Sequence, residues 1–350
     1  MILIAGGGAI GAGIAYRLAL RGARDVVLCD RGEICSGSTS RAMGGVRQQF
    51  STAAEVKLAQ ESIAFFVELG PPFFFQVGYL FLATTGEGLA ELDERRELQA
   101  SLGVPVESVD ASFVIGLETS DVLGAAFCAQ DGVADPPRVA RELVRRAREL
   151  GVEVREHTPA ETLFDGADTI VIACGPWSAG VAEELGVELP IRPLCRQLLA
   201  TESLPSPPAM LPMVVESETG FHFRRRGDRL VLAMADDEPR WSFETDVDES
   251  VFDDRLARLA HRFPHAAGCR IEEAWAGLYD MTPDAHPILG KVADGVYAAC
   301  GFSGHGFMQS PAVAQAIAEE ILDGESKLDL TPYRLERFAG DPGFPEAVVL

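Results

Sequence analysis

The stretch Ile2-Leu3-Ile4-Ala5-Gly6-Gly7-Gly8-Ala9-Ile10-Gly11 decides the fold. Four apolar residues suited to a buried parallel strand lead into glycines, and apolar residues at helical spacing follow from Ile10 to Arg21. In a Gly-x-Gly-x-x-Gly turn the first glycine permits the tight bend, the second lets the backbone approach a pyrophosphate, and the third allows close helix–strand packing. The stretch therefore predicts a Rossmann-like unit that binds a dinucleotide.

The residues just after this turn strengthen the prediction. Gly22 closes the helix, and the next strand, Val26 to Asp30, ends in a carboxylate at the spacing of one that binds the adenosine ribose. A tight turn without a ligand is the alternative, and Asp30 gives it little support. The cofactor contacts predicted here are Gly6, Gly8, Ala9, Ile10, Gly11, Asp30 and Arg31.

Two later segments favour FAD over NAD. The apolar run 169–173 reads as a buried strand that ends in the small residues Cys174 and Gly175. Residues 301–307 form a glycine-rich loop between a predicted strand, 295–300, and a predicted helix, 311–322. Three such turns spread over the chain suit a long cofactor that lies extended through the protein. We also expect a helix after Asp135, with Pro136 in its first turn.

A second part of the chain has a different character. Residues 76–85 and 220–235 are rich in aromatic and β-branched residues, and Gly227-Asp228 predicts a hairpin turn. Residues 251–263 read as an amphipathic helix. The predicted fold class is α/β (α+β overall), with a discontinuous Rossmann-like FAD-binding domain and an antiparallel-sheet substrate domain.

Composition excludes several classes of protein. With 47% apolar residues in 350, the chain can bury a large core, but no apolar run is long enough to cross a bilayer. The net charge of −23 opposes binding to nucleic acid. Seven scattered cysteines without Cys-x-x-Cys spacing predict neither disulfides nor a metal site, and the N-terminus reads as lacking a signal peptide, so we expect a cytoplasmic protein.

Several motifs, in family order, resemble the D-amino-acid-oxidase superfamily, in the branch of sarcosine oxidase, glycine oxidase and the proline dehydrogenase β subunit. Besides the first glycine turn and the loop 301–307, they are residues 36–40 with 44–47, 131–136, 173–177 and 277–284. The resemblance implies an FAD-binding domain of residues 1–76, 130–190 and 277–350. It implies a substrate-binding domain of residues 77–129 and 191–276.

The resemblance also implies the chemistry and the site. A hydride leaves the carbon next to a neutral amine for flavin N5, and the resulting imine hydrolyses. Arg47 matches an arginine that grips the substrate carboxylate, Tyr279 a tyrosine beside the substrate, and His222 and Met308 are further candidates. The alternatives are a surface arginine, a packing tyrosine and a solvated hairpin face that His222 shares with Arg224. The other implied FAD contacts are Ser38, Thr39, Ser40, Gly44, Gly45, Val154, Ala173, Cys174, Gly175, Trp177, Gly301, Gly304, His305, Gly306, Phe307 and Met308.

Three departures from the family pattern limit the assignment. Gly277 stands where sarcosine oxidase has the cysteine that links the flavin covalently, so we expect noncovalent FAD. Met308 stands where the family has a carboxylate-binding lysine, which favours secondary or tertiary amines such as sarcosine, dimethylglycine or proline. The three lysines, Lys57, Lys291 and Lys327, lie in a predicted helix, turn and tail, so we expect an electron acceptor other than oxygen. A D-amino-acid or glycine oxidase, a flavin subunit that needs a partner subunit, and an NAD-dependent dehydrogenase remain alternatives.

Overall fold

The computed structural model describes residues 1–205, 207–340, 345–347 and 349–350 and divides the chain into two compact units. Unit 1 contains Met1–Gly44, Asp135–Leu194 and Leu278–Val349, and unit 2 contains Gly45–Ala134, Cys195–Gly277 and Leu350. Each unit is therefore assembled from segments that are far apart in the sequence.

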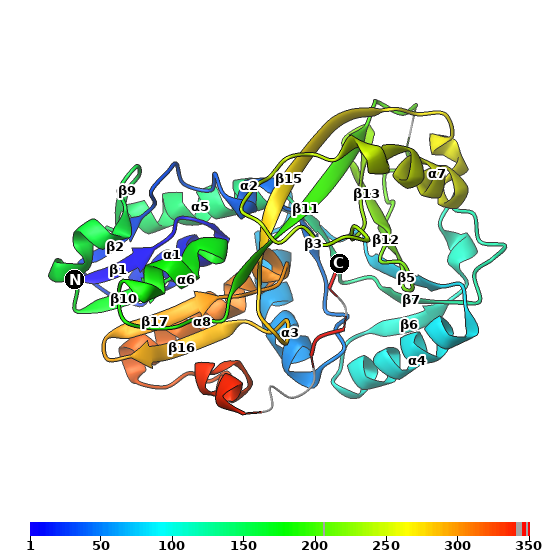
Figure 1. Cartoon of the computed structure of the whole chain (residues 1–350). Helices are drawn as coiled ribbons and strands as arrows, with labels where there is room; N and C mark the ends of the chain where they lie inside the picture. Colours follow the sequence, from blue (N-terminus) through cyan, green and yellow to red (C-terminus); the bar gives the residue numbers. More distant parts are fainter. Residues whose placement is uncertain (206, 341–344, 348) are drawn as a thin grey trace. The chain divides into compact units, whose positions relative to one another are not determined.

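Unit 1 is built on a six-stranded sheet in the order β16-β17-β10-β1-β2-β9 (Figure 1). The strands are β1 (Ile2–Ala5), β2 (Val26–Cys29), β9 (Glu153–Arg155), β10 (Thr169–Ile172), β16 (Ile288–Ala293) and β17 (Val296–Cys300). Central strand β1 pairs in parallel with β10 and β2, and the edge strand β16 is antiparallel to β17. Because β1, β2, β10 and β17 are parallel, the turns that follow them lie along one edge of the sheet.

Helices cover this sheet because its central strands are apolar on both faces. Leu3 and Ile4 point to opposite faces of β1, and neither is exposed. The helices of unit 1 are α1 (Ala9–Leu20), α2 (Ser38–Arg41), α5 (Pro136–Glu149), α6 (Ser178–Glu183) and α8 (Gly306–Asp323). Helix α1 packs against α5 and α8, and a Cβ atom on Gly13 would lie 3.0 Å from the Cβ of Ala314 in α8.

The structure confirms most elements predicted for unit 1. Helix α5 begins as predicted, because the Asp135 carboxylate accepts a hydrogen bond from the Arg138 N–H at 3.1 Å. The predicted start of the last helix at Pro311 is wrong, since α8 begins at Gly306. Proline lacks the N–H that would bond to the Phe307 carbonyl, and the Ser310 hydroxyl donates to that carbonyl instead, at 2.9 Å.

Unit 2 contains a mainly antiparallel sheet in the order β15-β11-β14-β13-β12-β5-β7-β6 and a small sheet in the order β3-β8-β4. The large sheet consists of β5 (Tyr79–Ala83), β6 (Val106–Val109), β7 (Gly124–Cys128), β11 (Arg192–Thr201), β12 (Met213–Glu216), β13 (His222–Arg226), β14 (Arg229–Ala233) and β15 (Ile271–Met281). The small sheet consists of β3 (Gly45–Val46), β4 (Phe74–Phe75) and β8 (Gly132–Ala134). The helices are α3 (Ala53–Leu69), α4 (Gly86–Ser101) and α7 (Phe252–Arg262).

Strand alternation separates an apolar face from a polar face in β13. Phe221, just before the strand, and Phe223 are fully buried in the core of unit 2, together with Leu230 and Leu232 of β14. The predicted hairpin is confirmed, with Arg226 paired to Arg229 across Gly227-Asp228. The alternative of a solvated hairpin face is wrong, because His222 and Arg224 are buried as well.

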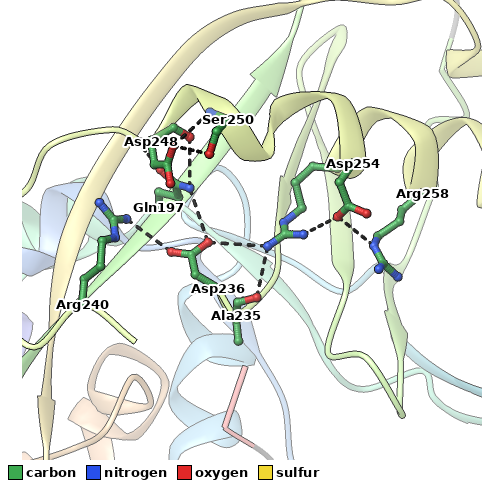
Figure 2. A network of polar contacts seen from close by, with 9 residues as sticks. Gln197, Ala235, Asp236, Arg240, Asp248, Ser250, Asp254 and Arg258 are labelled. Carbon is green, nitrogen blue, oxygen red and sulfur yellow. Dashed lines mark hydrogen bonds and ion pairs between the residues drawn. The ribbon is translucent and has the colours of Figure 1, made fainter. Parts of the chain in front are cut away.

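A polar network fixes the connection between β14 and α7 (Figure 2). The Asp236 carboxylate lies 3.3 Å from the Arg240 guanidinium and 3.5 Å from that of Arg255, whose own side chain is 8% exposed. Gln197 of β11 donates to the Asp236 carboxylate and accepts from the Asp248 N–H at 2.9 Å. These bonds tie the irregular segment 236–248 to the sheet and to the helix.

The two compact units differ from the predicted domains at their boundaries. Residues 45–76, predicted in the first domain, belong to unit 2, because β3 and β4 both pair with β8. The segment 155–167 contains the last residue of β9, Arg155, and one 3-10 helix, Ala160–Gly166. The 3-10 helices are Ala111–Phe113, Ala160–Gly166, Gly175–Trp177, Glu249–Val251, Pro264–Ala266, Thr331–Tyr333 and Leu335–Ala339. Within the described residues, no helix is both long and apolar enough to span a membrane.

Candidate functional site

The first glycine turn has a geometry that only glycine can adopt. Gly6 has φ +106°, and a Cβ atom there would lie 2.3 Å from the Ala173 carbonyl oxygen. A Cβ atom on Gly11 would lie 1.9 Å from the Gly6 carbonyl oxygen. The turn is therefore pressed between the ends of β1 and β10, which is the close backbone approach that the sequence predicts.

The N-terminus of α1 presents backbone donors at this turn. The helical hydrogen-bond ladder starts with the Ala12 N–H, which donates to the Gly8 carbonyl, so the N–H groups of Ala9, Ile10 and Gly11 precede it. The Ala9 N–H donates to the Thr39 hydroxyl at 3.0 Å. Positive charge from the helix dipole and free N–H groups make such a helix end suited to a pyrophosphate.

Asp30 lies beside the glycine turn, as predicted. One carboxylate oxygen accepts from the Gly7 N–H and the other from the Gly32 N–H, both at 2.8 Å. Each oxygen has a second lone pair, so the carboxylate can still accept bonds from ribose hydroxyls. Val154 of β9 pairs with Leu28 of β2, the strand that ends just before Asp30.

Helix α2 brings hydroxyl groups next to the same turn. Ser38 donates to the Leu278 carbonyl at 2.7 Å, and Ser40 donates to the carbonyls of Ser36 and Gly37. Thr39 faces the N-terminus of α1 through its bond from Ala9. The structure thus places Thr39 at the first turn, whereas the hydroxyls of Ser38 and Ser40 bond to backbone carbonyls outside this turn.

The end of β10 forms the second predicted turn. Gly175 has φ +54°, and the Cys174 thiol lies 3.2 Å from the Ala5 carbonyl oxygen at the end of β1. The Trp177 ring has the Arg31 guanidinium carbon 4.5 Å from its centroid, so these two predicted contacts stack on each other. The structure therefore brings Ala173, Cys174 and Gly175 to the edge that carries the first turn.

The third turn joins β17 to α8. Gly301 and Gly304 have φ +78° and +96°, and a Cβ atom on Gly304 would lie 2.5 Å from the Tyr279 ring. His305 precedes Gly306 and Phe307, the first residues of α8, and Met308 is buried in its first turn. Tyr279 thus packs on the backbone of this loop, which supports the packing explanation.

A buried carboxylate that sequence reasoning missed holds this loop in place. The Asp280 side chain accepts from the Gly301 N–H at 2.7 Å, and its backbone carbonyl accepts from the Ser303 N–H. Burial raises the pKa of Asp280 to about 6, against hydrogen bonds from Phe302 and Gly301 that lower it. Asp280 lies in the motif of residues 277–284, but the sequence alone does not reveal whether an aspartate is buried.

Unit 2 contains two of the predicted catalytic residues, Arg47 and His222, and both are buried. Arg47 is 1% exposed; its guanidinium donates to the Gln49 carbonyl and lies 4.0 Å from the centroid of the Phe50 ring. Gly45 is close by in sequence, and a Cβ atom there would lie 2.4 Å from the Tyr79 hydroxyl. Packing against Tyr79 therefore explains Gly45, while Gly44, with φ +82°, belongs to unit 1.

His222 is neutral at physiological pH. Burial, and then the charge of Arg47, lower its pKa to about 4, and a bond to the Gly220 carbonyl only partly offsets them. Its Nδ1 lies 2.8 Å from that carbonyl oxygen, which can only accept, so Nδ1 carries the proton and Nε2 is an acceptor. Arg47 and His222 are thus two buried side chains of unit 2, one a fixed cation and the other a neutral acceptor.

The three glycine turns share features that fit the binding of a dinucleotide. All three follow parallel strands of one sheet, two of them carry glycines at positive φ where a side chain would meet backbone or a ring, and two lead into long helices. This combination defines a Rossmann-like nucleotide-binding unit, and the donor set of helix N–H groups and one carboxylate fits FAD.

Comparison with known proteins identifies the family. The family described as FAD dependent oxidoreductase (DAO) matches residues 1–320, so the chain belongs to it and is an FAD-dependent oxidoreductase. FAD-dependent oxidoreductase domain-containing protein 1 of Xenopus laevis is 28% identical, over 96% of this chain and 82% of its own. Glycine oxidase of Geobacillus kaustophilus is 26% identical over 98% of both chains. The crystal structure of L-proline dehydrogenase from P. horikoshii is 26% identical, covers 97% of both chains and has a TM-score of 0.88.

Proposed function

We propose that this enzyme oxidises the C–N bond of a small amine or amino acid to an imine, with noncovalently bound FAD. The observation that carries the proposal is that Arg47 and neutral His222 are both buried, in a family member whose unit 1 fits FAD. The names of two relatives, a glycine oxidase and an L-proline dehydrogenase, support an amino-acid substrate. When bound, FAD accepts a hydride at N5 from the carbon next to the amine nitrogen.

Arg47 binds the substrate carboxylate in this proposal. Its planar guanidinium can donate to both carboxylate oxygens at once, and burial strengthens such a charged pair. The ring of Phe50 and the Gln49 carbonyl hold the guanidinium in one orientation. A small amino acid or N-alkylated amino acid would therefore be oriented by its carboxylate.

His222 accepts a hydrogen bond from the substrate amine in this proposal. Because Nδ1 donates to the Gly220 carbonyl, Nε2 can accept a hydrogen bond from an amine N–H. Only a neutral amine has the lone pair that assists hydride loss from the neighbouring carbon, and the positive charge of Arg47 opposes a second cation beside it. Tyr279 and Met308 are proposed to contact substrate and flavin respectively, and Gly277 leaves no thiol for a covalent bond.

We infer that sarcosine, dimethylglycine or proline is the substrate and that the electron acceptor is not oxygen. All three lysines are exposed; Lys57 lies in α3, Lys327 follows α8, and Lys291 lies in strand β16 rather than in the predicted turn, 3.0 Å from Asp294. Rapid reoxidation of the dithionite-reduced protein in aerated buffer would show that oxygen is an acceptor and overturn this part.

Anaerobic titration of the FAD-loaded protein with sarcosine, dimethylglycine, L-proline, glycine and D-alanine tests the function. We expect the flavin absorbance to bleach with sarcosine, dimethylglycine or L-proline and to bleach weakly with glycine and D-alanine. Bleaching by D-alanine or glycine alone would indicate the alternative oxidase. A protein that dithionite bleaches but no amine does would indicate a flavin subunit that needs a partner.

A further inference from the structure

The segment Arg47-Gln48-Gln49-Phe50 is entirely buried although three of its four side chains are polar. Such a segment needs internal hydrogen-bond partners because each unpaired buried group costs free energy. The Phe50 carbonyl accepts from the Gln99 side chain of α4 at 2.8 Å, and the Gln49 side chain donates to the Tyr79 carbonyl at 3.2 Å. Three further hydrogen bonds of this segment converge on one carboxylate.

That carboxylate belongs to Asp131, which is 0% exposed. Its Oδ1 accepts from the Gln48 backbone N–H at 3.0 Å and from the Gln48 side-chain amide at 3.1 Å, and its Oδ2 accepts from the Gln49 side-chain amide at 3.1 Å. Its backbone carbonyl accepts from the Gly78 N–H at 2.9 Å. Asp131 is thus bonded three times to the two residues that follow Arg47.

Gln49 connects this carboxylate to Arg47. Its side chain donates to Asp131, and its backbone carbonyl accepts from the Arg47 guanidinium. A shift of Gln49 would therefore move the acceptor that orients the guanidinium. Burial raises the pKa of Asp131 to about 6, so the side chain is mainly ionised above pH 7 and can accept all three bonds.

We propose that Asp131 is a positioning residue that holds the Arg47 guanidinium in the orientation needed to bind a substrate carboxylate. This inference rests on the proposed role of Arg47. A purely structural Asp131 would affect all ligands alike, whereas a positioning residue affects those that carry a carboxylate. The two cases are separated by comparing ligands that do and do not engage Arg47.

The experiment uses Asp131→Asn in the FAD-loaded enzyme, with Asp110→Asn as the matched control on an exposed aspartate of unit 2. Binding of acetate and of pyrrolidine, an amine without a carboxylate, is followed by the change in flavin absorbance. We expect acetate to bind about tenfold more weakly to Asp131→Asn, the usual effect of leaving buried donors unpaired, with pyrrolidine binding and FAD content unchanged. In an Arg47→Lys background the loss should shrink to less than about twofold, since coupled residues are not additive.

Each other outcome contradicts one statement. Equal losses for acetate and pyrrolidine, an undiminished loss in the Arg47→Lys background, or unchanged acetate binding while Arg47→Ala weakens it would overturn the role of Asp131. Acetate binding that Arg47→Ala leaves unchanged would instead overturn the carboxylate role of Arg47. If Asp131→Asn does not fold, Gln49→Leu gives the same test, because it removes one of the three donors and keeps the backbone carbonyl.

Discussion

At the scale of single residues, the close contacts of the first glycine turn determine what the chain tolerates. A Cβ atom on Gly11 would meet the Gly6 carbonyl oxygen, which belongs to the backbone and cannot rotate away. Gly180 in α6 has nothing within 4 Å of its ideal Cβ position. The same substitution at these two glycines therefore has opposite consequences.

We expect Gly11→Ala to lose FAD and to be destabilised by about 1–3 kcal/mol, the usual cost of overpacking. The matched variant Gly180→Ala should keep FAD and gain up to about 1 kcal/mol, because alanine favours a helix. Flavin absorbance per chain and urea unfolding measure both effects. Full FAD content in Gly11→Ala would contradict the assignment of this turn to the cofactor.

Arg47→Ala should weaken binding of a carboxylated substrate by about 2–5 kcal/mol, the usual loss for a buried charged pair. FAD content should not change, since Arg47 belongs to unit 2. The ratio kcat/KM for the substrate found in the amine titration measures the loss. Unchanged kinetics would assign Arg47 a structural role only.

Sequence reasoning found the residues whose chemistry depends on chain position and missed those whose chemistry depends on burial. The glycines at 6, 8 and 11 and the carboxylate at 30 have a fixed spacing that a local turn imposes. Asp131 and Asp280 became recognisable only when the fold removed them from water. The neutral state of His222 likewise follows from burial and the charge of Arg47.

At the scale of elements, the end of β15 and the loop after β17 act as one structure. Asp280 accepts from Gly301, and the Thr282 N–H donates to the Ser303 hydroxyl at 3.2 Å. A Cβ atom on Gly301 would lie 2.5 Å from the Thr282 side chain. The conformation of the third glycine turn therefore depends on the adjacent strand.

This link predicts a pH dependence of stability. The folded-state pKa of Asp280 is raised to about 6 from 3.8, so its stabilising contribution is complete below about pH 4 and is lost as the pH rises through 6. Asp280→Asn keeps an acceptor for Gly301 but does not titrate. The stability of the wild type relative to this variant should therefore fall by about 3 kcal/mol between pH 4 and 7. Urea unfolding across this range checks it, and a pH-independent difference would contradict a buried, titrating Asp280.

The elements also show where local sequence signals fail. Helix α5 has its predicted start because the capping aspartate and the prolines act locally. Helix α8 extends five residues before Pro311, because a serine hydroxyl replaces the missing proline donor and the preceding residues pack in unit 1. A proline thus predicts a helix start only when the chain before it has no other reason to be helical.

At the scale of the whole molecule, two properties follow from composition and connectivity. The net charge of −23 makes the folded chain repel itself. The family resemblance implies two domains of interleaved segments, but it does not give the position of residues 45–76, which depends on strand pairing with β8.

Because the net charge of −23 makes the chain repel itself, salt should stabilise the protein. Raising ionic strength from about 0.01 M to about 0.15 M shortens the Debye length from about 30 Å to about 8 Å and screens repulsion among the carboxylates. With FAD at saturation, the melting temperature should rise by a few degrees. A melting temperature that falls with salt would show that attractive ion pairs outweigh the net charge.

The central claim is that three glycine turns on one sheet edge hold one FAD without a covalent bond. The most direct measurement is the flavin content of the purified protein, before and after acid denaturation. We predict a yellow protein that releases one FAD per chain into the supernatant. A colourless protein that takes up no FAD on reconstitution, or flavin that stays in the precipitate, would contradict the claim.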